Sequence, residues 1–140
     1  MGKRAASALI GGLAILLAGP APGTAGSTPG TPWKRAEVFA TCSGRLAALA
    51  ARQQAERDPA STDTMRQREM FELMLEATLP EAVTYGVPQD EPLRWRSAGW
   101  VETAGLLADM TYAGDEIRTA RAAAALDARI SDCTGLLLGG

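Results

Sequence analysis

Histidine is absent from this sequence of 140 residues, and so is asparagine. The lack of histidine removes the commonest general base near neutral pH and the commonest transition-metal ligand. It also excludes Ser-His-Asp and Cys-His catalysis and covalent haem attachment through a CxxCH motif. No glycine-rich phosphate loop is present, because glycine pairs occur only in the N-terminal apolar stretch and at the C-terminus. We therefore predict a protein without enzymatic activity and without a cofactor or bound metal.

Aromatic residues and clusters of positive charge are also scarce. Aromatics make up 5% of the chain and apolar residues 46%, so Ala, Leu, Val, Ile and Met must supply most of the core. That mixture favours helices over sheets. The formal net charge is −2 and no basic run occurs, so the counterion release that drives nucleic-acid binding has no source here. Abundant alanine and the near replacement of lysine by arginine are associated with bacterial coding sequences.

The N-terminus has the pattern of an export signal. Lys3 and Arg4 precede an uncharged, largely apolar stretch over residues 5–18, and Pro20 interrupts it. A positive start followed by a short apolar segment is typical of a secretory signal peptide. The stretch is shorter than the roughly 20 apolar residues of a membrane-spanning helix. Cleavage is therefore favoured over the alternative of an uncleaved signal anchor, which would be the chain's one contact with a membrane.

Small residues at the end of this segment place the expected cleavage after Ala25. The domain organisation that follows is a signal peptide over 1–25, a flexible lead over 26–31 and a helical domain over 32–140. Removing the two cations of the signal lowers the formal charge from −2 to −4. We expect the mature protein to be periplasmic or secreted.

Four segments of the domain carry apolar residues at helical spacing. The first runs from Pro32, capped by Thr31, to about Arg57. The second begins at Ser61 or Thr62, and Pro80 should end or kink it. The apolar seams of these two segments contain Phe39, Cys42, Leu46 and Leu49, and then Met70, Phe71, Met74, Leu75 and Leu79.

A loop rich in proline and glycine over 86–92 separates the second segment from the third. Gly114 should close the third helix, and Asp115 should cap the fourth. Their seams are predicted to contain Ala98, Val101, Gly105, Ala108 and Tyr112, and then Ala123, Leu126, Ile130, Cys133 and Leu137. Four amphipathic helices with short connections predict an all-α fold, a small up-down-up-down four-helix bundle.

The two cysteines are expected to form a disulfide between the first and fourth helices. Cys42 and Cys133 both lie on seams and, in this topology, near the same end of the bundle. An exported protein with an even number of cysteines usually pairs them. In the chain-entropy model, closing so long a loop stabilises the fold by roughly 4 to 5 kcal/mol. Two buried, reduced thiols are the alternative.

The segment after the proline-rich loop is the candidate partner or ligand surface. Arg94, Trp95, Arg96 and Trp100 stand close together in it. Tryptophan and arginine are the residues most enriched at binding hot spots, and guanidinium groups can grip a carboxylate or phosphate. The alternative is structural: the tryptophans fill one end of the core and the arginines point outward.

Two carboxylate patterns carry weaker hypotheses. Glu69, Glu72 and Glu76 follow one side of the second helix and could face a divalent cation, although a solvated row is the simpler interpretation. Asp109, on the apolar third helix, could have a raised pKa, although pairing with an arginine explains it more simply. A hydrolase that uses these carboxylates is the remotest function considered.

The leading functional hypothesis is a non-enzymatic envelope protein, structural or interacting, whose unknown partner is another envelope protein. The alternative is a carrier of a small apolar or amphipathic ligand within the bundle. No motif in the chain is specific enough to choose between them.

Overall fold

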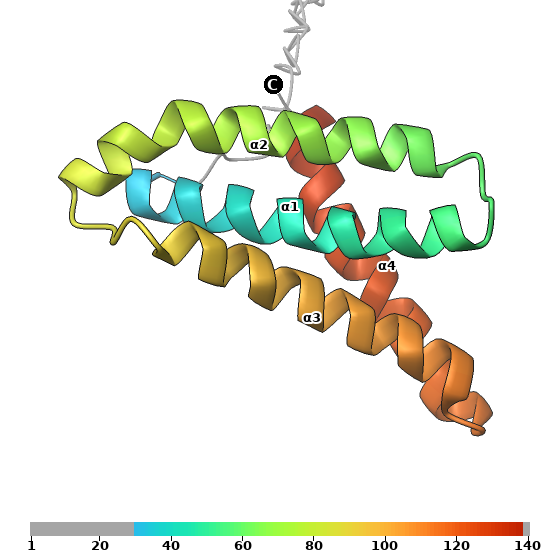
Figure 1. Ribbon diagram of the computed structural model, residues 1–140. Coiled ribbons are helices and arrows are strands. Elements are labelled where there is room, and N and C mark those ends of the chain that lie inside the picture. Colours follow the sequence, from blue (N-terminus) through green and yellow to red (C-terminus); the bar gives the residue numbers. More distant parts are fainter. Residues whose placement is uncertain (1–29, 139–140) are drawn as a thin grey trace, which may run out of the picture.

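The computed structural model describes residues 30–138, which form four helices and contain no strand (Figure 1). The helices are α1 (Pro32–Ala55), α2 (Ser61–Thr84), α3 (Glu91–Tyr112) and α4 (Glu116–Leu138). The predicted all-α bundle of four helices is therefore confirmed. The predicted signal peptide, most of the lead and the last two residues lie outside the described part of the chain.

Helix α1 occupies the centre of the arrangement. It packs along α2 on one side and along α3 on another, whereas α4 packs mainly on α3 (Figure 1). Phe39 of α1 and Phe71 of α2 are buried with their ring centroids 6.2 Å apart. Leu46 and Leu75 complete the same α1–α2 interface. The seam predicted for the first helix is therefore its true inner face, and most of the core lies between α1 and α2.

Side-chain caps set two of the helix starts where the sequence places them. The Thr31 hydroxyl accepts a hydrogen bond from the Lys34 amide at 3.1 Å, and Pro32 occupies the first turn of α1. The Asp115 carboxylate accepts one from the Ile117 amide at 2.9 Å at the start of α4. Helix α1 ends two residues earlier than predicted, because Arg57 adopts a left-handed conformation with φ 59°.

Pro80 does not end α2, contrary to one of the two outcomes predicted for it. The helix continues for one further turn to Thr84. The Pro80 ring is exposed, while Ala82 on the following turn is fully buried against the core. The Thr84 hydroxyl donates to the Pro80 carbonyl at 3.0 Å. Burial of this last turn offsets the hydrogen bond that proline cannot donate.

The disulfide between Cys42 and Cys133 is present, as predicted, with Cα atoms 5.6 Å apart. Both cysteines are buried. Helix α4 crosses α1 obliquely and touches it over a short stretch only, so the disulfide lies at the point where the two helices meet (Figure 1). The disulfide therefore attaches α4, which otherwise packs mainly on α3, to the central helix α1.

Two glycines let α1 and α3 approach each other closely. A side chain added at Gly44 would overlap the backbone carbonyl of Arg96, and one added at Gly99 would overlap the carbonyl of Thr41. Each glycine is thus covered by the backbone of the other helix. This mutual contact determines which side of α3 faces inward.

The seam predicted for the third helix is wrong. All five of its residues are exposed, including Val101 at 65% and Tyr112 at 80%. The buried positions of α3 are instead Pro92, Gly99 and Thr103. Small and apolar residues occupy both sides of this helix, so periodicity alone could not choose between them. The glycine contact marks the inward side, because a side chain added at Gly99 would overlap the α1 backbone, whereas nothing lies near one added at Gly105.

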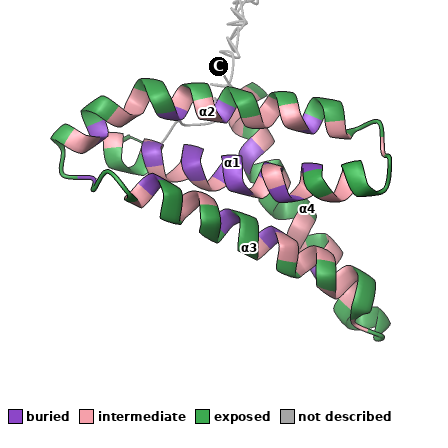
Figure 2. Ribbon diagram, viewed as in Figure 1, coloured by how far each residue is buried: buried purple, intermediate pink, exposed green. Residues whose placement is uncertain are grey.

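Length and hydropathy decide whether the helices of residues 30–138 can cross a bilayer. None of them combines the necessary length with sufficient hydropathy. Each instead has an exposed side and a side that is at least partly buried (Figure 2).

We expect Gly99→Ala to lower the free energy of unfolding by about 1 to 3 kcal/mol, because the added methyl group must displace the α1 backbone. Urea unfolding followed by circular dichroism measures the change. Gly135→Ala is the matched control, since nothing lies near the added methyl group in α4 and helix propensity should raise stability by up to about 1 kcal/mol. A Gly99→Ala protein as stable as wild type would refute the close contact.

Candidate functional site

The four residues of the predicted surface share α3 but do not share one face. Trp95 is half-buried and packs against the core, with its ring edge-on to Trp33 at a centroid distance of 6.3 Å. Arg94 is exposed and pairs within its own helix with Glu91 at 3.3 Å. Arg96 and Trp100 are the two that lie together, beside α1. Trp95 therefore supports the fold, while Arg94 and Trp100 are accessible from solvent.

Arg96 crosses the space between α3 and α2 to reach Glu72. Its guanidinium Nη2 lies 2.6 Å from Glu72 Oε2, and the Ser43 hydroxyl of α1 donates to the other carboxylate oxygen. Arg68 adds a second positive charge nearby. Burial raises the pKa of Glu72, but the hydrogen bonds from Ser43 and Arg96 and the two positive charges lower it by more. Three helices thus meet at one ionised carboxylate.

The acidic row predicted on α2 separates in the structure. Glu72 belongs to this network, whereas Glu69 and Glu76 are exposed. No group of three metal-ligating side chains occurs among residues 30–138. Asp109 pairs with Arg118 of α4 at 2.7 Å, as the simpler interpretation of the sequence predicted. These carboxylates stand in ion pairs or in solvent, on different faces.

Glu102 forms a second network that the sequence analysis missed. Arg45 of α1 donates to one of its oxygens at 2.9 Å, and Arg129 of α4 donates to the other at 2.7 Å. Burial raises the pKa of Glu102, and the two arginines lower it by more. The sign in the sequence was a carboxylate among small and apolar residues, the same pattern that singled out Asp109. Glu102 joins α1, α3 and α4 beside the disulfide.

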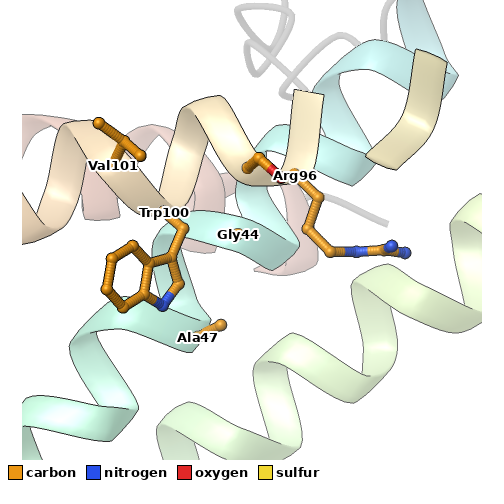
Figure 3. A pocket seen from close by; sticks show the side chains of 6 residues that line it. Gly44, Ala47, Arg96, Trp100 and Val101 are labelled. Carbon is orange, nitrogen blue, oxygen red and sulfur yellow. The ribbon is translucent and has the colours of Figure 1, made fainter. Parts of the chain in front are cut away.

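A groove lies where Trp100 extends past the glycine contact (Figure 3). Its volume is about 330 Å³ and it opens to solvent. The Trp100 ring, 45% exposed, forms one wall, and small residues of α1 form the floor. Its lining residues are Gly44, Ala47, Arg96, Ser97, Trp100 and Val101. An aromatic wall over a floor of small residues can accept an apolar side chain of a partner.

The outward side of α3 continues this apolar surface along the whole helix. The exposed residues Arg94, Ala98, Val101, Gly105, Ala108 and Tyr112, which we name the outer stripe, follow one another at spacings of four and three. Arg96, Glu102 and Asp109, the charged residues of the middle and end of α3, are all paired with other helices. The outer stripe therefore carries no charge beyond Arg94. In Figure 2 this side of α3 is exposed, whereas the side toward α1 is partly buried.

No family model, curated protein or solved structure matches this chain. The groove at Trp100 and the outer stripe form one continuous surface of α3, in which the exposed side chains of Trp100, Val101 and Tyr112 stand among small residues.

The Glu72 network predicts a pH-dependent contribution to stability. Because the pKa of folded Glu72 is lowered from 4.5, the network stabilises the fold above that pH and loses this effect as the pH falls through the folded pKa. We expect Glu72→Gln to lower the free energy of unfolding by about 1 to 3 kcal/mol at pH 7, and the difference from wild type to shrink below pH 4.5.

Urea titrations at pH 7 and at several values below 4.5 measure this difference. Glu76→Gln is the matched control, because it removes an exposed carboxylate one turn further along α2 and should change stability little. A penalty for Glu72→Gln that stays constant down to acidic pH would show that the carboxylate does not act through its charge.

Proposed function

We propose that this chain is a non-enzymatic protein-interaction module that acts outside the cytoplasm and docks its partner on the outward side of α3. The observation that supports it is the outer stripe with the adjoining Trp100 groove, an apolar surface that no other helix of residues 30–138 covers. Large exposed apolar surfaces on small proteins usually mark contact sites. A catalytic function has no comparable support, because Glu72, Glu102 and Asp109 are each paired with an arginine and lie on separate faces.

Two of the four residues of the predicted surface, Trp95 and Arg96, have structural roles and are not part of the proposed docking surface. Trp95 packs on Trp33, and Arg96 holds Glu72, so both are engaged inside the fold. Trp100 and Val101 are exposed and free to meet a partner. The proposed surface therefore extends from Arg94 to Tyr112 along α3, with Trp100 at its edge toward α1.

The alternative function, transport of a small apolar ligand within the bundle, requires an enclosed hollow. The groove at Trp100 opens to solvent, and so do a hollow of about 370 Å³ between the start of α2 and the end of α4 and one of about 550 Å³ beside Pro80. Surface hollows between helices suit side chains of a partner better than a sequestered ligand. A docking function is therefore preferred.

The location outside the cytoplasm is supported by the disulfide, since such bonds persist in oxidising compartments. We expect the mature protein to begin near Gly26 and to contain no free thiol. Intact mass of the product from a bacterial periplasmic fraction, with and without reduction and alkylation, measures both. A full-length product with two alkylatable thiols in the cytoplasm would overturn this part of the proposal.

Docking on α3 is tested by photo-crosslinking in the organism that makes the protein. We expect p-benzoylphenylalanine at Val101 to give a discrete protein adduct, because this side chain stands in the proposed surface. The same probe at Leu73 of α2 is the matched control, since both side chains are 65% exposed. Equal labelling from the two positions, or none from Val101, would contradict docking on α3.

A further inference from the structure

The order of side-chain sizes along the outer stripe bears on what covers it. Its spacings are four, three, four, three and four, so the stripe reads the same from either end. Sizes follow the same symmetry at the flanks: Arg94 and Tyr112 are long, and Ala98 and Ala108 are small. At the centre, Val101 stands beside Gly105. A surface of this kind can match a copy of itself turned end for end.

We propose that the partner of α3 is a second copy of this chain, packed antiparallel along the outer stripe about a two-fold axis. The proposal rests on the proposed function, because it names the partner of that same surface. In this register Val101 of one copy opposes Gly105 of the second copy, and Ala98 opposes Ala108. The valine side chain then fills the space above the glycine, which is the small-against-large packing that close helix pairs use.

The charges select the antiparallel direction. Arg94 is the one charged residue of the outer stripe, and its side chain is 73% exposed. Two parallel copies would place Arg94 against Arg94, which costs free energy through like-charge repulsion. The antiparallel register places it against the Tyr112 ring of the second copy, where a cation–π contact is favourable. Tyr112 is 80% exposed in the single chain and gains this contact on association.

The charged flanks of α3 favour a second copy over a membrane surface. Interfacial helices carry lysine and arginine on their polar sides. The flanks here carry both signs: Glu91, Glu102 and Asp109 as well as Arg96, each held in an ion pair, and the chain as a whole is acidic. Because the arginines of α3 are already paired with carboxylates, they offer anionic phospholipids little attraction, and the paired flanks do not oppose contact through the outer stripe.

The extent of the stripe sets the expected affinity. A helix of 22 residues is about 33 Å long, and its contacting side is about 10 Å wide. That strip is smaller than the roughly 800 Å² per partner of a standard interface. We therefore expect a reversible dimer whose population rises between about 10 μM and 1 mM rather than a permanent one.

Sedimentation velocity of the purified, disulfide-intact protein over this concentration range tests the proposal. We expect Ala98→Lys and Ala108→Glu each to weaken dimerisation by about tenfold or more, because each buries an unpaired charge at the stripe. Both positions are exposed in the single chain, so circular dichroism should show unchanged helix content. Leu73→Glu, on the exposed side of α2, is the control and should leave dimerisation unchanged.

The double variant with Ala98→Lys and Ala108→Glu then tests the register. In the antiparallel dimer the introduced lysine of one copy opposes the introduced glutamate of the second copy, so the double variant should dimerise more tightly than either single variant. In a parallel dimer like charges would meet, and the double variant should dimerise least. The second result would overturn the antiparallel register.

Two outcomes would overturn the second copy as partner. One is a wild-type chain that stays monomeric to 1 mM. The other is a monomer that co-sediments with vesicles of anionic phospholipid, which would assign the stripe to a membrane surface. The photo-crosslink at Val101 separates this failure from failure of the proposed function: an adduct of a different protein keeps docking on α3, an adduct of twice the chain mass supports the dimer, and no adduct removes both.

Discussion

The close contact between α1 and α3 is the constraint on which the other features of this structure depend. Gly44 and Gly99 each lie against the backbone of the opposite helix, so the two axes approach more closely than larger residues would allow. That approach fixes the rotation of α3 about its own axis. It brings Arg96 within reach of Glu72 and Glu102 within reach of Arg45. It also directs the outer stripe away from α1, so the exposed apolar surface follows from the internal packing.

The core around α1 could be predicted from the sequence because large apolar side chains at helical spacing determine which face of the helix is buried. Phe39, Cys42 and Leu46 recur at helical spacing along α1 and are all buried. On α2 the predicted seam is buried at Phe71 and Leu75, whereas Met70 is exposed. The disulfide was predictable for a related reason, since Cys42 and Cys133 both stand on inward seams. The caps at Thr31 and Asp115 depend on local chemistry, which sequence patterns report well.

Helix α3 could not be predicted in the same way because both of its sides are built from small and apolar residues. The more regular repeat, which contains Val101 and Tyr112, faces solvent, and the less regular side with Gly99 and Thr103 faces α1. The predicted seam included Gly105, and what distinguishes Gly99 from it is the α1 backbone opposite, which the repeat of a single helix does not report. The Glu72 and Glu102 networks were hidden for another reason, since they join residues 24 to 57 positions apart in the chain.

Amide hydrogen exchange measured along the chain tests most directly whether the α1–α3 contact organises the molecule. The account predicts that residues 36–50 of α1 and residues 96–103 of α3 exchange slowest and at similar rates, because each covers the other's backbone. Residues 108–112, beyond the contact, should exchange faster. The contradicting result is exchange over residues 96–103 as fast as over residues 108–112 while α1 stays protected. The α1–α3 contact would then not explain why the outer stripe faces solvent.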